Sequence, residues 1–268
     1  MIEQIPLARL LGIPRLRRII TRAYERQLLA EIKAHGRVPK HVGIILDGNR
    51  RFASKQGLPS VAGHVRGANK LEEVLEWCQE LGIKHVTVYA FSTENFRRSP
   101  EEVSALMKLF AERFKQAAAD ERVHKYKIRI RAIGDLNKLP SDVREAIEIA
   151  QKATSGYDGY TLNIAIGYGG RAELAHAVRK ICERIERGEL KPDQVNEKLI
   201  EQNLYTAGLP DPDLIIRTSG EERLSGFLLW QSAYSELYFC EANWPEFTKL
   251  EFLRAIRNYQ ARERRFGR

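Results

Sequence analysis

A short polar segment that follows the first apolar stretch of the chain has the composition of a phosphate-binding turn. Residues 41–46 lead into Asp47, Gly48, Asn49, Arg50 and Arg51. Glycine lets backbone N–H groups approach an anion closely, the helix expected next offers unpaired N–H donors at its start, and Arg51 can add a bidentate contact. The segment therefore indicates a phosphate site. The alternative, from these residues alone, is a surface helix cap with solvated arginines.

Two further segments that follow apolar stretches are rich in anion-binding groups. In an open parallel sheet, the residues that leave the strands meet at one edge, where ligands bind. Arginines from three strands would hold more phosphate than one mononucleotide presents, which favours two diphosphates as ligands. The two segments are Ser92-Thr93-Glu94-Asn95-Phe96-Arg97-Arg98 and Arg217-Thr218-Ser219-Gly220-Glu221-Glu222-Arg223-Leu224-Ser225.

Two acidic residues, Asp47 and Glu236, border predicted strands and are expected to meet at this edge of the sheet. Mg²⁺ usually takes one or two carboxylates together with substrate phosphate oxygens and water. A two-carboxylate site without histidine is therefore chemically reasonable. The alternative for Glu236 is a plain acid at the end of a strand.

A glycine-rich segment at residues 167–172 fits the loose pattern of a dinucleotide-binding turn. It follows the fourth predicted strand rather than the first, and the acids about 20 residues further on, Glu186 and Glu189, lie at a predicted helix end. A tight turn between a strand and a helix explains these glycines. A nicotinamide-dependent oxidoreductase is the enzyme alternative that they would support.

The histidines and cysteines show no metal-ligand spacing. Cys78, Cys182 and Cys240 lie far apart, which argues against a disulfide framework and against a cysteine-based zinc site. His64 has a glycine on either side at short range and is expected early in the second helix. His64 could bind a ligand; the alternative is a buried histidine whose hydrogen bonds are satisfied within the protein.

The rest of the chain alternates short apolar strands with helical periodicity, which is typical of a mostly parallel α/β sheet. Residues 38–268 are expected to form one such domain, because no repeat or Gly/Ser linker divides them. Ser99 predicts a helix start, with Pro100 in the first turn and Glu102 closing a capping box. The last helix is expected around residues 247–263. The six predicted strands are 41–46, 85–91, 127–133, 161–166, 214–217 and 236–239.

Residues 1–37 are expected to form a basic amphipathic helical extension, broken near Pro14. A helix packed on its own domain is the alternative. The net charge of +9 comes from the two ends of the chain, since residues 1–37 and 254–268 each contribute +5 and the remainder is nearly neutral. This distribution suits an anionic membrane surface, substrate or partner at least as well as nucleic acid, and we expect no nucleic-acid partner.

The sequence predicts a cytoplasmic protein, with peripheral contact to the membrane face as a further expectation. No apolar run approaches the roughly 18 residues that cross a bilayer. The N-terminal region carries arginines where a signal peptide has an uncharged stretch. These are Arg9, Arg15, Arg17 and Arg18.

Residues 41–51, 89–95 and 216–221 together resemble motifs of the cis-prenyltransferase family, to which undecaprenyl and dehydrodolichyl diphosphate synthases belong. The similarity continues through residues 227–231, 235–239 and 262–267, and covers roughly 38–268. It implies a six-stranded parallel sheet with helices on both sides. It also implies a Mg²⁺-dependent enzyme that adds isopentenyl diphosphate units to an allylic diphosphate in Z geometry. Members of the family act as homodimers or as heterodimers with a degenerate partner, and we expect a homodimer.

The resemblance also implies roles for individual residues. Asp47 would hold Mg²⁺ with Glu236 and assist departure of the allylic diphosphate, and Asn95 would assist proton removal. An amide is a poor base, so diphosphate itself is an alternative proton acceptor. Arg265 and Gly267 would reach the active site of the partner. The full set of implied substrate-binding residues is Gly48, Asn49, Arg50, Arg51, Phe52, His64, Ser92, Thr93, Glu94, Phe96, Arg98, Arg217, Arg223, Leu224, Ser225, Arg265 and Gly267.

Arg50, Phe52 and Ser60 depart from bacterial members and are similar to the residues of archaeal or eukaryotic relatives. They leave farnesyl and geranylgeranyl diphosphate open as primers. No Asp-Asp pair occurs, which disfavours an enzyme that elongates in E geometry. A non-catalytic subunit of a heteromeric prenyltransferase is the functional alternative, although the retained motif residues favour self-sufficient catalysis.

The growing prenyl chain would need an apolar tunnel. Residues 1–37 could bring the exit of this tunnel to a membrane surface. Eight apolar residues are candidates to line it, and most of them could equally be core. They are Leu71, Val74, Leu75, Phe91, Val103, Leu106, Met107 and Phe110.

Overall fold

Six parallel strands form the centre of the fold, which confirms the predicted fold class and all six predicted strands. Their order across the sheet is β3-β4-β2-β1-β5-β6, and every neighbouring pair runs parallel. The computed structural model describes residues 14–262, with side chains from Arg18 onward. The strands are β1 (His41–Ile45), β2 (His85–Ser92), β3 (Ile128–Ile133), β4 (Tyr160–Tyr168), β5 (Leu214–Arg217) and β6 (Glu236–Phe239).

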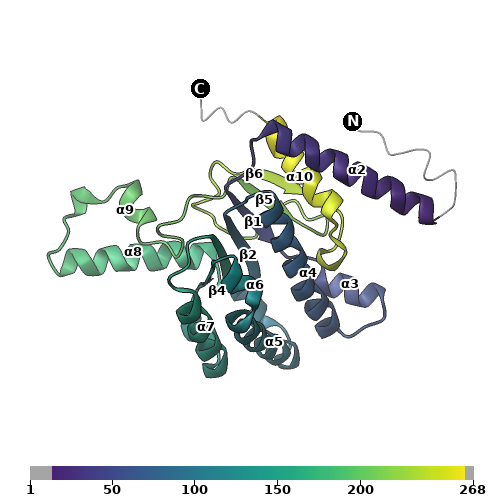
Figure 1. The fold of residues 1–268 in the computed structure, drawn as a ribbon. Helices are drawn as coiled ribbons and strands as arrows, with labels where there is room; N and C mark the ends of the chain where they lie inside the picture. The colour runs from purple at the N-terminus through teal and green to yellow at the C-terminus, as the bar shows by residue number, and fades with distance from the viewer. Residues whose placement is uncertain (1–13, 263–268) are drawn as a thin grey trace.

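Helices and short 3₁₀ turns connect the strands (Figure 1). Within residues 14–262, no helix is both long and apolar enough to cross a bilayer. The helices are α2 (Pro14–His35), α3 (Asn49–Lys55), α4 (Ser60–Glu80), α5 (Pro100–Ala119), α6 (Glu121–Lys125), α7 (Ser141–Thr154), α8 (Gly170–Glu186), α9 (Glu197–Glu201) and α10 (Lys249–Ala261). The 3₁₀ turns are η1 (Thr93–Arg97), η2 (Leu136–Lys138), η3 (Pro192–Gln194) and η4 (Trp244–Glu246).

The order of the strands places a switch point between β1 and β5. From β1 the chain passes to β2 on one side, whereas from β5 it passes to β6 on the other side. The carboxyl ends of two such strands leave a crevice between them, because their outgoing connections diverge. Asp47 follows β1 and Arg217 ends β5, so both belong to this crevice.

The two faces of the sheet are covered differently. Helices α4, α5, α7 and α10 pack on one face, where alternate strand residues such as Val42 and Ile44 join two apolar clusters. The opposite face is covered by residues 218–235 and by the start of α8, through Phe227, Leu228 and Tyr168. In Figure 1, α8 and α9 project away from the sheet as an arm. The site must therefore be built from loops at the strand ends rather than from these packed faces.

Helix α2 lies along α10, and its C-terminal half belongs to the core (Figure 1). Leu28 and Ile32 are fully buried in the largest apolar cluster. The Gln260 side chain donates hydrogen bonds to the backbone oxygens of Ile32, at 3.0 Å, and Arg37, at 2.8 Å. This packing matches the alternative considered above for the extension, while the domain boundary at residue 38 stays a prediction.

The predicted helix start at Ser99 is confirmed, with one difference. The Ser99 hydroxyl accepts a hydrogen bond from the Glu102 backbone N–H at 3.3 Å and caps α5. The Glu102 carboxylate does not close the capping box, because it binds the guanidinium of Arg98 at 3.1 Å. Glu102, predicted to cap the helix with its side chain, thus forms an ion pair with Arg98 instead.

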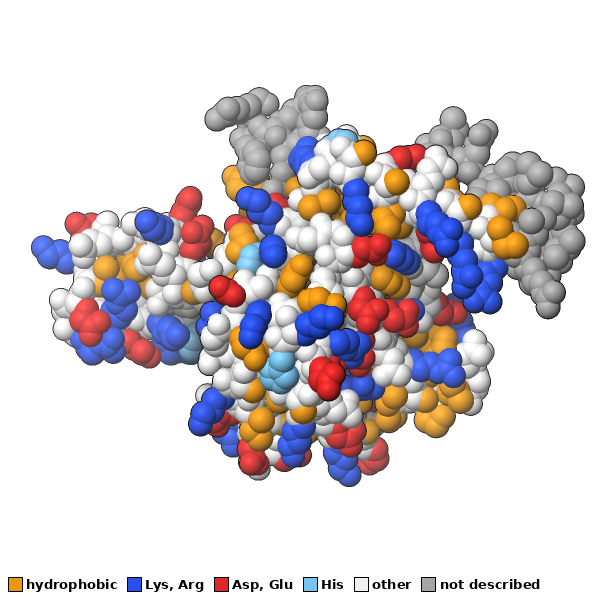
Figure 2. Space-filling model, in the orientation of Figure 1, with side chains coloured by type: hydrophobic (Ala, Val, Ile, Leu, Met, Phe, Trp, Pro, Cys, Tyr) orange, Lys and Arg blue, Asp and Glu red, His pale blue; other side chains and the backbone are white. Residues whose placement is uncertain are grey.

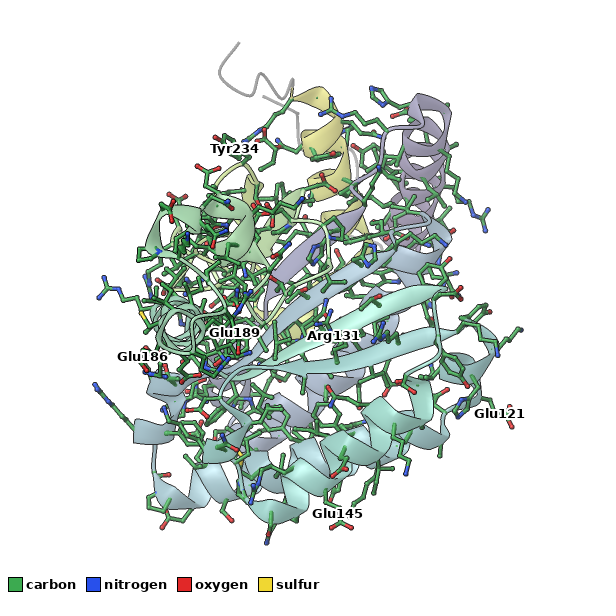
Figure 3. The ribbon with its side chains drawn as sticks, turned by 90° about the vertical axis from the view of Figure 1, so that its left-hand side faces the viewer. Glu121, Arg131, Glu145, Glu186, Glu189 and Tyr234 are labelled. Carbon is green, nitrogen blue, oxygen red and sulfur yellow. The ribbon has the colours of Figure 1, made fainter. Side chains whose placement is uncertain are left out.

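The glycines at residues 167–170 form a tight turn between β4 and α8, as expected. A Cβ atom on Gly170 would lie 2.4 Å from the Gly226 backbone oxygen, and one on Gly169 would lie 2.8 Å from the Thr93 hydroxyl. Close approach of neighbouring segments therefore requires both glycines. Glu186 ends α8 and Glu189 follows it, both on the projecting arm (Figure 3), so neither follows a strand as the acid of a dinucleotide site does.

Candidate active site

The turn after β1 shapes the first part of the site. Gly48 has a φ angle of 100°, which residues with a Cβ atom rarely adopt, and a Cβ there would lie 2.9 Å from the Asn243 backbone. Its N–H donates to the Asp47 side chain at 2.7 Å. The Thr218 hydroxyl donates to the Asp47 backbone oxygen at 2.7 Å and ties the turn to the segment after β5. Backbone and side chains together therefore fix the Asp47 carboxylate.

An ion pair joins the two strand ends of the crevice. The Arg217 guanidinium donates to the Asp47 carboxylate at 2.8 Å and to the Ser225 hydroxyl at 2.8 Å. The Arg217 side chain is only 4% exposed, whereas that of Asp47 is 34% exposed. The Nε atom of Arg217 is buried and has no hydrogen-bond partner in the described structure. A buried cationic donor without a partner is a group that an anionic ligand can satisfy.

A second group of charges surrounds Glu221. Arg51 donates to the backbone oxygen of Ser219 at 2.7 Å and to its hydroxyl at 2.6 Å. The Glu221 carboxylate pairs with both Arg51 and Arg223, and these hydrogen bonds lower its pKa. Two arginines from different strand ends are therefore held together by one partly exposed carboxylate, which an incoming phosphate group could replace.

Backbone strain accompanies these contacts. Ser219 has a φ angle of 78° and Ser225 one of 48°, both in the left-handed region that costs a non-glycine residue on the order of 1 kcal/mol or more. The Ser219 hydroxyl contacts Arg51 and the Ser225 hydroxyl contacts Arg217. The strained conformations thus occur at the two serines that position the arginines.

Glu102 is the centre of a third group. Its carboxylate lies 3.1 Å from Arg98, 3.7 Å from Arg50 and 3.5 Å from the Nε2 atom of His64. Burial lowers the pKa of His64, and the nearby Arg98 lowers it further, so the ring is neutral at pH 7. Burial also lowers the pKa of Arg98. One acid therefore neutralises a cluster that is poised to hold an anion.

These groups border two adjoining cavities. Leu46, Asn49 and His64 line both of them, so the polar cavity leads into the apolar one. The polar cavity contains the predicted diphosphate-binding turn and adds residues that the sequence did not single out, from the end of α3 onward. Its lining is completed by Asp47, Gly48, Arg50, Arg51, Ser54, Lys55, Leu58, Ser60 and Arg98.

The apolar cavity runs between the sheet and helices α4 and α5, with a volume of about 360 Å³. Four of the eight predicted tunnel residues line it, namely Leu71, Leu75, Leu106 and Phe110. The other four are absent from its lining and pack in the core or against it. They are Val74, Phe91, Val103 and Met107.

The segment after β2 forms the 3₁₀ turn η1, and its Asn95 has a structural contact. The Asn95 carbonyl oxygen accepts a hydrogen bond from the Ser92 N–H at 3.0 Å, within a reciprocal capping box. Phe96 packs edge-on against Phe91, with ring centroids 4.8 Å apart. Thr93 faces Gly169, as described above. No hydrogen bond links η1, including Glu94, to Asp47 among the described residues, so proton removal by Asn95 stays a prediction.

The expected meeting of Asp47 and Glu236 is wrong for a single chain. Glu236 is the first residue of β6 and is in register with Leu214, the first residue of β5, so it lies at the amino edge of the sheet. Asp47 lies at the opposite edge, on the order of 15 Å further along the strands at ~3.3 Å per residue. The Glu236 carboxylate pairs with Arg262 at 2.7 Å. The sequence prediction failed here because Glu236 begins its predicted strand whereas Asp47 follows the end of one, and in a parallel sheet these two positions lie at opposite edges.

The remaining predicted residues divide into buried, partly buried and undescribed ones. Phe52 is 6% exposed and lies under the Arg66 guanidinium, 5.4 Å from its ring centroid. Leu224 is partly buried against the apolar cluster on the second face. Arg265 and Gly267 lie outside the described residues. Phe52 and Leu224 thus have packing contacts, and neither lines the polar or the apolar cavity.

The donor set at Asp47 fits a magnesium ion bound chiefly by its substrate. One carboxylate is partly exposed beside the phosphate-binding turn, and Mg²⁺ commonly takes one or two carboxylates with phosphate oxygens and water. Among residues 14–262 there is no cluster of three or more His, Cys, Asp or Glu side chains that could hold a metal ion. Asp47 would therefore be the ligand from one chain.

Sequence reasoning missed several residues that complete the site. Glu102 was assigned to a helix cap, and Thr218 and Ser219 were noted only as part of an anion-binding segment. Trp244 is fully buried, and its backbone N–H donates to the Asp47 backbone oxygen at 2.9 Å. The signals for Glu102 were its positions four residues after Arg98 and three after Ser99, and the second of these fitted a capping box.

The chain is similar to known proteins over most of its length. Residues 45–267 match the family model described as putative undecaprenyl diphosphate synthase. The chain is 55% identical over 246 residues to a geranylgeranyl-diphosphate-specific tritrans,polycis-undecaprenyl-diphosphate synthase of Thermococcus kodakarensis, covering 92% of this chain and 93% of that protein. A protein of the same name from Methanopyrus kandleri is 56% identical over 249 residues, with 93% and 92% covered.

Two solved structures are also similar. A lavandulyl diphosphate synthase from Lavandula x intermedia, solved with dimethylallyl diphosphate, superposes with a TM-score of 0.81 and 37% identity, covering 86% of this chain and 99% of that one. A probable undecaprenyl diphosphate synthase from Campylobacter jejuni gives a TM-score of 0.71 and 35% identity, covering 87% and 100%. Both similarities extend over most of this chain rather than over one motif.

Proposed function

Since the chain belongs to the undecaprenyl diphosphate synthase family, we propose that Asp47 and Arg217 mark the place where it joins an allylic prenyl diphosphate to isopentenyl diphosphate. The chain is a cis-prenyltransferase, which lengthens an isoprenoid diphosphate by successive five-carbon units in Z geometry. One observation carries the assignment of the site. The arginine-rich polar cavity leads directly into a long apolar cavity, as a substrate with a charged head and a hydrocarbon tail requires.

The allylic diphosphate is assigned to the turn after β1. Gly48 and Asn49 line the polar cavity at the start of α3, and Arg50, Arg51 and Arg98 supply positive charge there. The names of the archaeal relatives specify geranylgeranyl diphosphate, and the residues Phe52 and Ser60 already indicated relatives of that kind. We therefore assign geranylgeranyl diphosphate as the preferred primer of this chain.

Isopentenyl diphosphate is assigned to the residues after β5. Arg217 offers its unpartnered Nε–H, Ser225 offers a hydroxyl, and Arg223 is exposed at the rim of the site. A diphosphate that binds Arg217 competes with Asp47 for the same guanidinium. Binding of the second substrate would thus free the Asp47 carboxylate beside the first one, which couples occupation of the two subsites.

The chemical step breaks the bond between the allylic carbon and its diphosphate oxygen. Negative charge then develops on the leaving diphosphate, and the arginines that line the polar cavity would stabilise it. The new carbon–carbon bond forms between the allylic carbon and the terminal alkene carbon of isopentenyl diphosphate. Loss of one proton completes the reaction, which releases inorganic diphosphate and an allylic diphosphate longer by one unit.

The proton acceptor can be assigned by comparing the basic groups near the site. The Asn95 carbonyl oxygen already accepts the Ser92 N–H and an amide is a weak base, whereas a diphosphate oxygen lies beside the reacting carbons in any productive arrangement. His64 is neutral but lies beside Glu102 and Arg98 in the assigned diphosphate site of the primer. We therefore assign proton removal to a diphosphate oxygen, with Asn95 positioning η1.

Magnesium belongs to this proposal as a cofactor of the reaction. Asp47 would hold it together with diphosphate oxygens, and a bound Mg²⁺ neutralises charge that develops on the leaving group. A second carboxylate could come only from elsewhere, since Glu236 of the same chain lies at the other edge of the sheet. Glu236 of a second copy in a homodimer is assigned to this role, whereas Arg265 and Gly267 of that copy are assigned to contacts with the substrate.

The experiment uses the purified chain with labelled isopentenyl diphosphate, Mg²⁺ and detergent, and compares geranylgeranyl with farnesyl diphosphate. We expect butanol-extractable polyprenyl product, formed faster with geranylgeranyl diphosphate and lost when EDTA is added. Faster reaction with farnesyl diphosphate would reject the primer assignment. No product with either primer would contradict catalysis by this chain alone and would favour a subunit that requires a partner.

A further inference from the structure

The apolar cavity is shorter than the product named for the relatives. It extends along β2 from Asn49 and His64, near the diphosphate cradle, to Lys84 and Tyr160 at the amino edge of the sheet. β2 has 8 residues, which correspond to about 26 Å at ~3.3 Å per residue. An undecaprenyl chain spans roughly 50 Å, at about 4.5 Å per unit by scaling from the ~3.5 Å of an extended peptide residue. A chain of that length must coil tightly or leave the cavity.

Only part of the cavity wall can open without breaking backbone structure. One side is the parallel sheet itself. The far end is closed by the turn before β4, where the Gly159 and Tyr160 N–H groups both bind the Lys127 backbone oxygen, and by Lys84 stacked 4.4 Å from the Tyr160 ring centroid. The remaining side lies between α4 and α5, and residues of both helices line the cavity there.

A network of ion pairs bridges α4 to α5 and α6 at this side, and we name it the α4–α5 seam. It consists of Glu72, Glu76, Arg113, Asp120 and Arg122, all of which line the cavity. Glu72 binds Arg113 at 3.2 Å and Arg122 at 2.9 Å, and Arg122 also binds Glu76 at 3.2 Å and Asp120 at 2.7 Å. Figure 2 shows acidic and basic side chains side by side over α4 and α6.

The seam is the weak wall of an otherwise apolar cavity. Its pairs are solvent-exposed, for example 45% for Glu72 and 48% for Arg122, so each contributes at most about 1 kcal/mol. Keeping one five-carbon unit out of water is worth roughly 4 kcal/mol at ~0.8 kcal/mol per carbon. A chain that outgrows the cavity can therefore separate these side chains at lower cost than it can open the turn before β4.

We propose that the α4–α5 seam is the exit of the growing prenyl chain and that its ion pairs help to set product length. This inference rests on the proposed function, because it takes the cavity as the site of the hydrocarbon tail. Weaker pairs let the chain pass outward earlier, so that elongation continues to longer products. Stronger pairs retain the chain and favour release at shorter length.

The first experiment measures product length by mass spectrometry for Arg122→Ala, which removes three carboxylate contacts. We expect the mean product to lengthen by at least one five-carbon unit, with the rate of the first condensation within twofold of the parent. Lys249→Ala is the matched control, since Lys249 binds Glu80 of α4 at 2.5 Å but lines neither cavity. Lys84→Ala tests the far end of the cavity. Unchanged or shorter products from Arg122→Ala, or lengthening by Lys84→Ala alone, would overturn the proposal.

The second experiment does not depend on turnover. Gln116→Cys, in a Cys182→Ser background that removes the exposed native thiol, places a thiol beside Arg113 of the seam. Added undecaprenyl diphosphate is expected to slow alkylation of that thiol at least fivefold, whereas geranylgeranyl diphosphate leaves it within twofold. Equal alkylation with both ligands would overturn the exit assignment. If the parent chain forms no product, the proposed function fails separately, because the protection assay still reports where the long chain lies.

Discussion

At the scale of single residues, the site is defined by charges that already have partners. Asp47 binds Arg217, Glu221 binds two arginines, and Glu102 lies among Arg98, Arg50 and His64. In each case an acid of the protein occupies the contact that a diphosphate would take. The site is therefore preorganised without leaving arginines to repel one another before substrate binds.

Glu102→Gln tests this view through stability rather than rate. The variant leaves the half-buried Arg98 without its counter-charge, so we expect the free energy of unfolding of the free protein to fall by about 1–3 kcal/mol. Bound geranylgeranyl diphosphate replaces that charge. The ligand-induced rise in the unfolding temperature should therefore be larger for the variant than for the parent.

Differential scanning fluorimetry with and without the diphosphate gives this comparison. Glu112→Gln is the matched control, because Glu112 lies exposed on the same helix α5 and has no ion pair among the described residues. An equal ligand-induced shift for Glu102→Gln and Glu112→Gln would contradict the assigned role of Glu102.

At the scale of elements, a series of buried side-chain hydrogen bonds crosses β1, β2 and β4. His41 donates through Nδ1 to the Pro210 backbone oxygen at 2.6 Å, so its Nε2 accepts from the Thr87 hydroxyl at 2.7 Å. Thr87 in turn accepts from the Asn163 amide at 3.0 Å. Burial lowers the pKa of His41 to about 4, and the bond to Pro210 only partly opposes this.

This histidine makes stability depend on pH in a defined direction. Between about pH 4 and 6.5 the unfolded chain binds a proton at His41 and the folded chain does not, so the free energy of unfolding falls as pH falls through that window. The contribution is about 1.4 kcal/mol per pH unit. His41→Gln should reduce the measured slope by this amount.

Urea unfolding at pH 4.5 to 6 compares the two slopes, with His35→Gln, a change at an exposed histidine at the end of α2, as the control. Equal slopes for the parent and His41→Gln would show that burial and the hydrogen bonds across the strands do not keep His41 neutral.

The elements were largely predictable from the sequence, whereas the closing contacts of the site were not. Alternating apolar runs located all six strands, and the residues leaving β1 and β5 identified the crevice, because parallel strands bring their carboxyl ends together. Glu236 was misplaced, because it begins the predicted strand 236–239, and the first residue of a strand in a parallel sheet lies at the amino edge, away from Asp47. Glu102 was predicted to cap a helix, because it lies three residues after Ser99. Its carboxylate instead lies near Arg50 and His64, which are distant in the sequence.

At the scale of the whole molecule, the N-terminal region has two parts with different expected roles. Leu28 and Ile32 of α2 are core residues, so removal of residues 1–37 should cost several kcal/mol of stability. Removal of residues 1–17 leaves both in place. That region contains Arg9, Arg15 and Arg17 among apolar residues, and Ile19 just beyond it is 63% exposed.

We expect deletion of residues 1–17 to reduce binding to liposomes that contain anionic lipid at least fivefold, while activity in detergent stays within twofold of the parent. Co-sedimentation with vesicles measures the binding, and neutral vesicles serve as the control. Unchanged binding to anionic vesicles would reject a role of these residues at membranes.

The most direct test of catalysis at the crevice between β1 and β5 is the rate of labelled isopentenyl diphosphate incorporation by Asp47→Asn. The substitution keeps the size of the side chain but removes the charge beside the leaving diphosphate, and loss of one such electrostatic contact costs roughly 10²–10³-fold in rate. Asp158→Asn, at an exposed aspartate before β4, is the matched control. A fall of at least about 100-fold for Asp47→Asn with an unchanged control is the predicted result. A rate within a few-fold of the parent would place the chemistry elsewhere in the molecule.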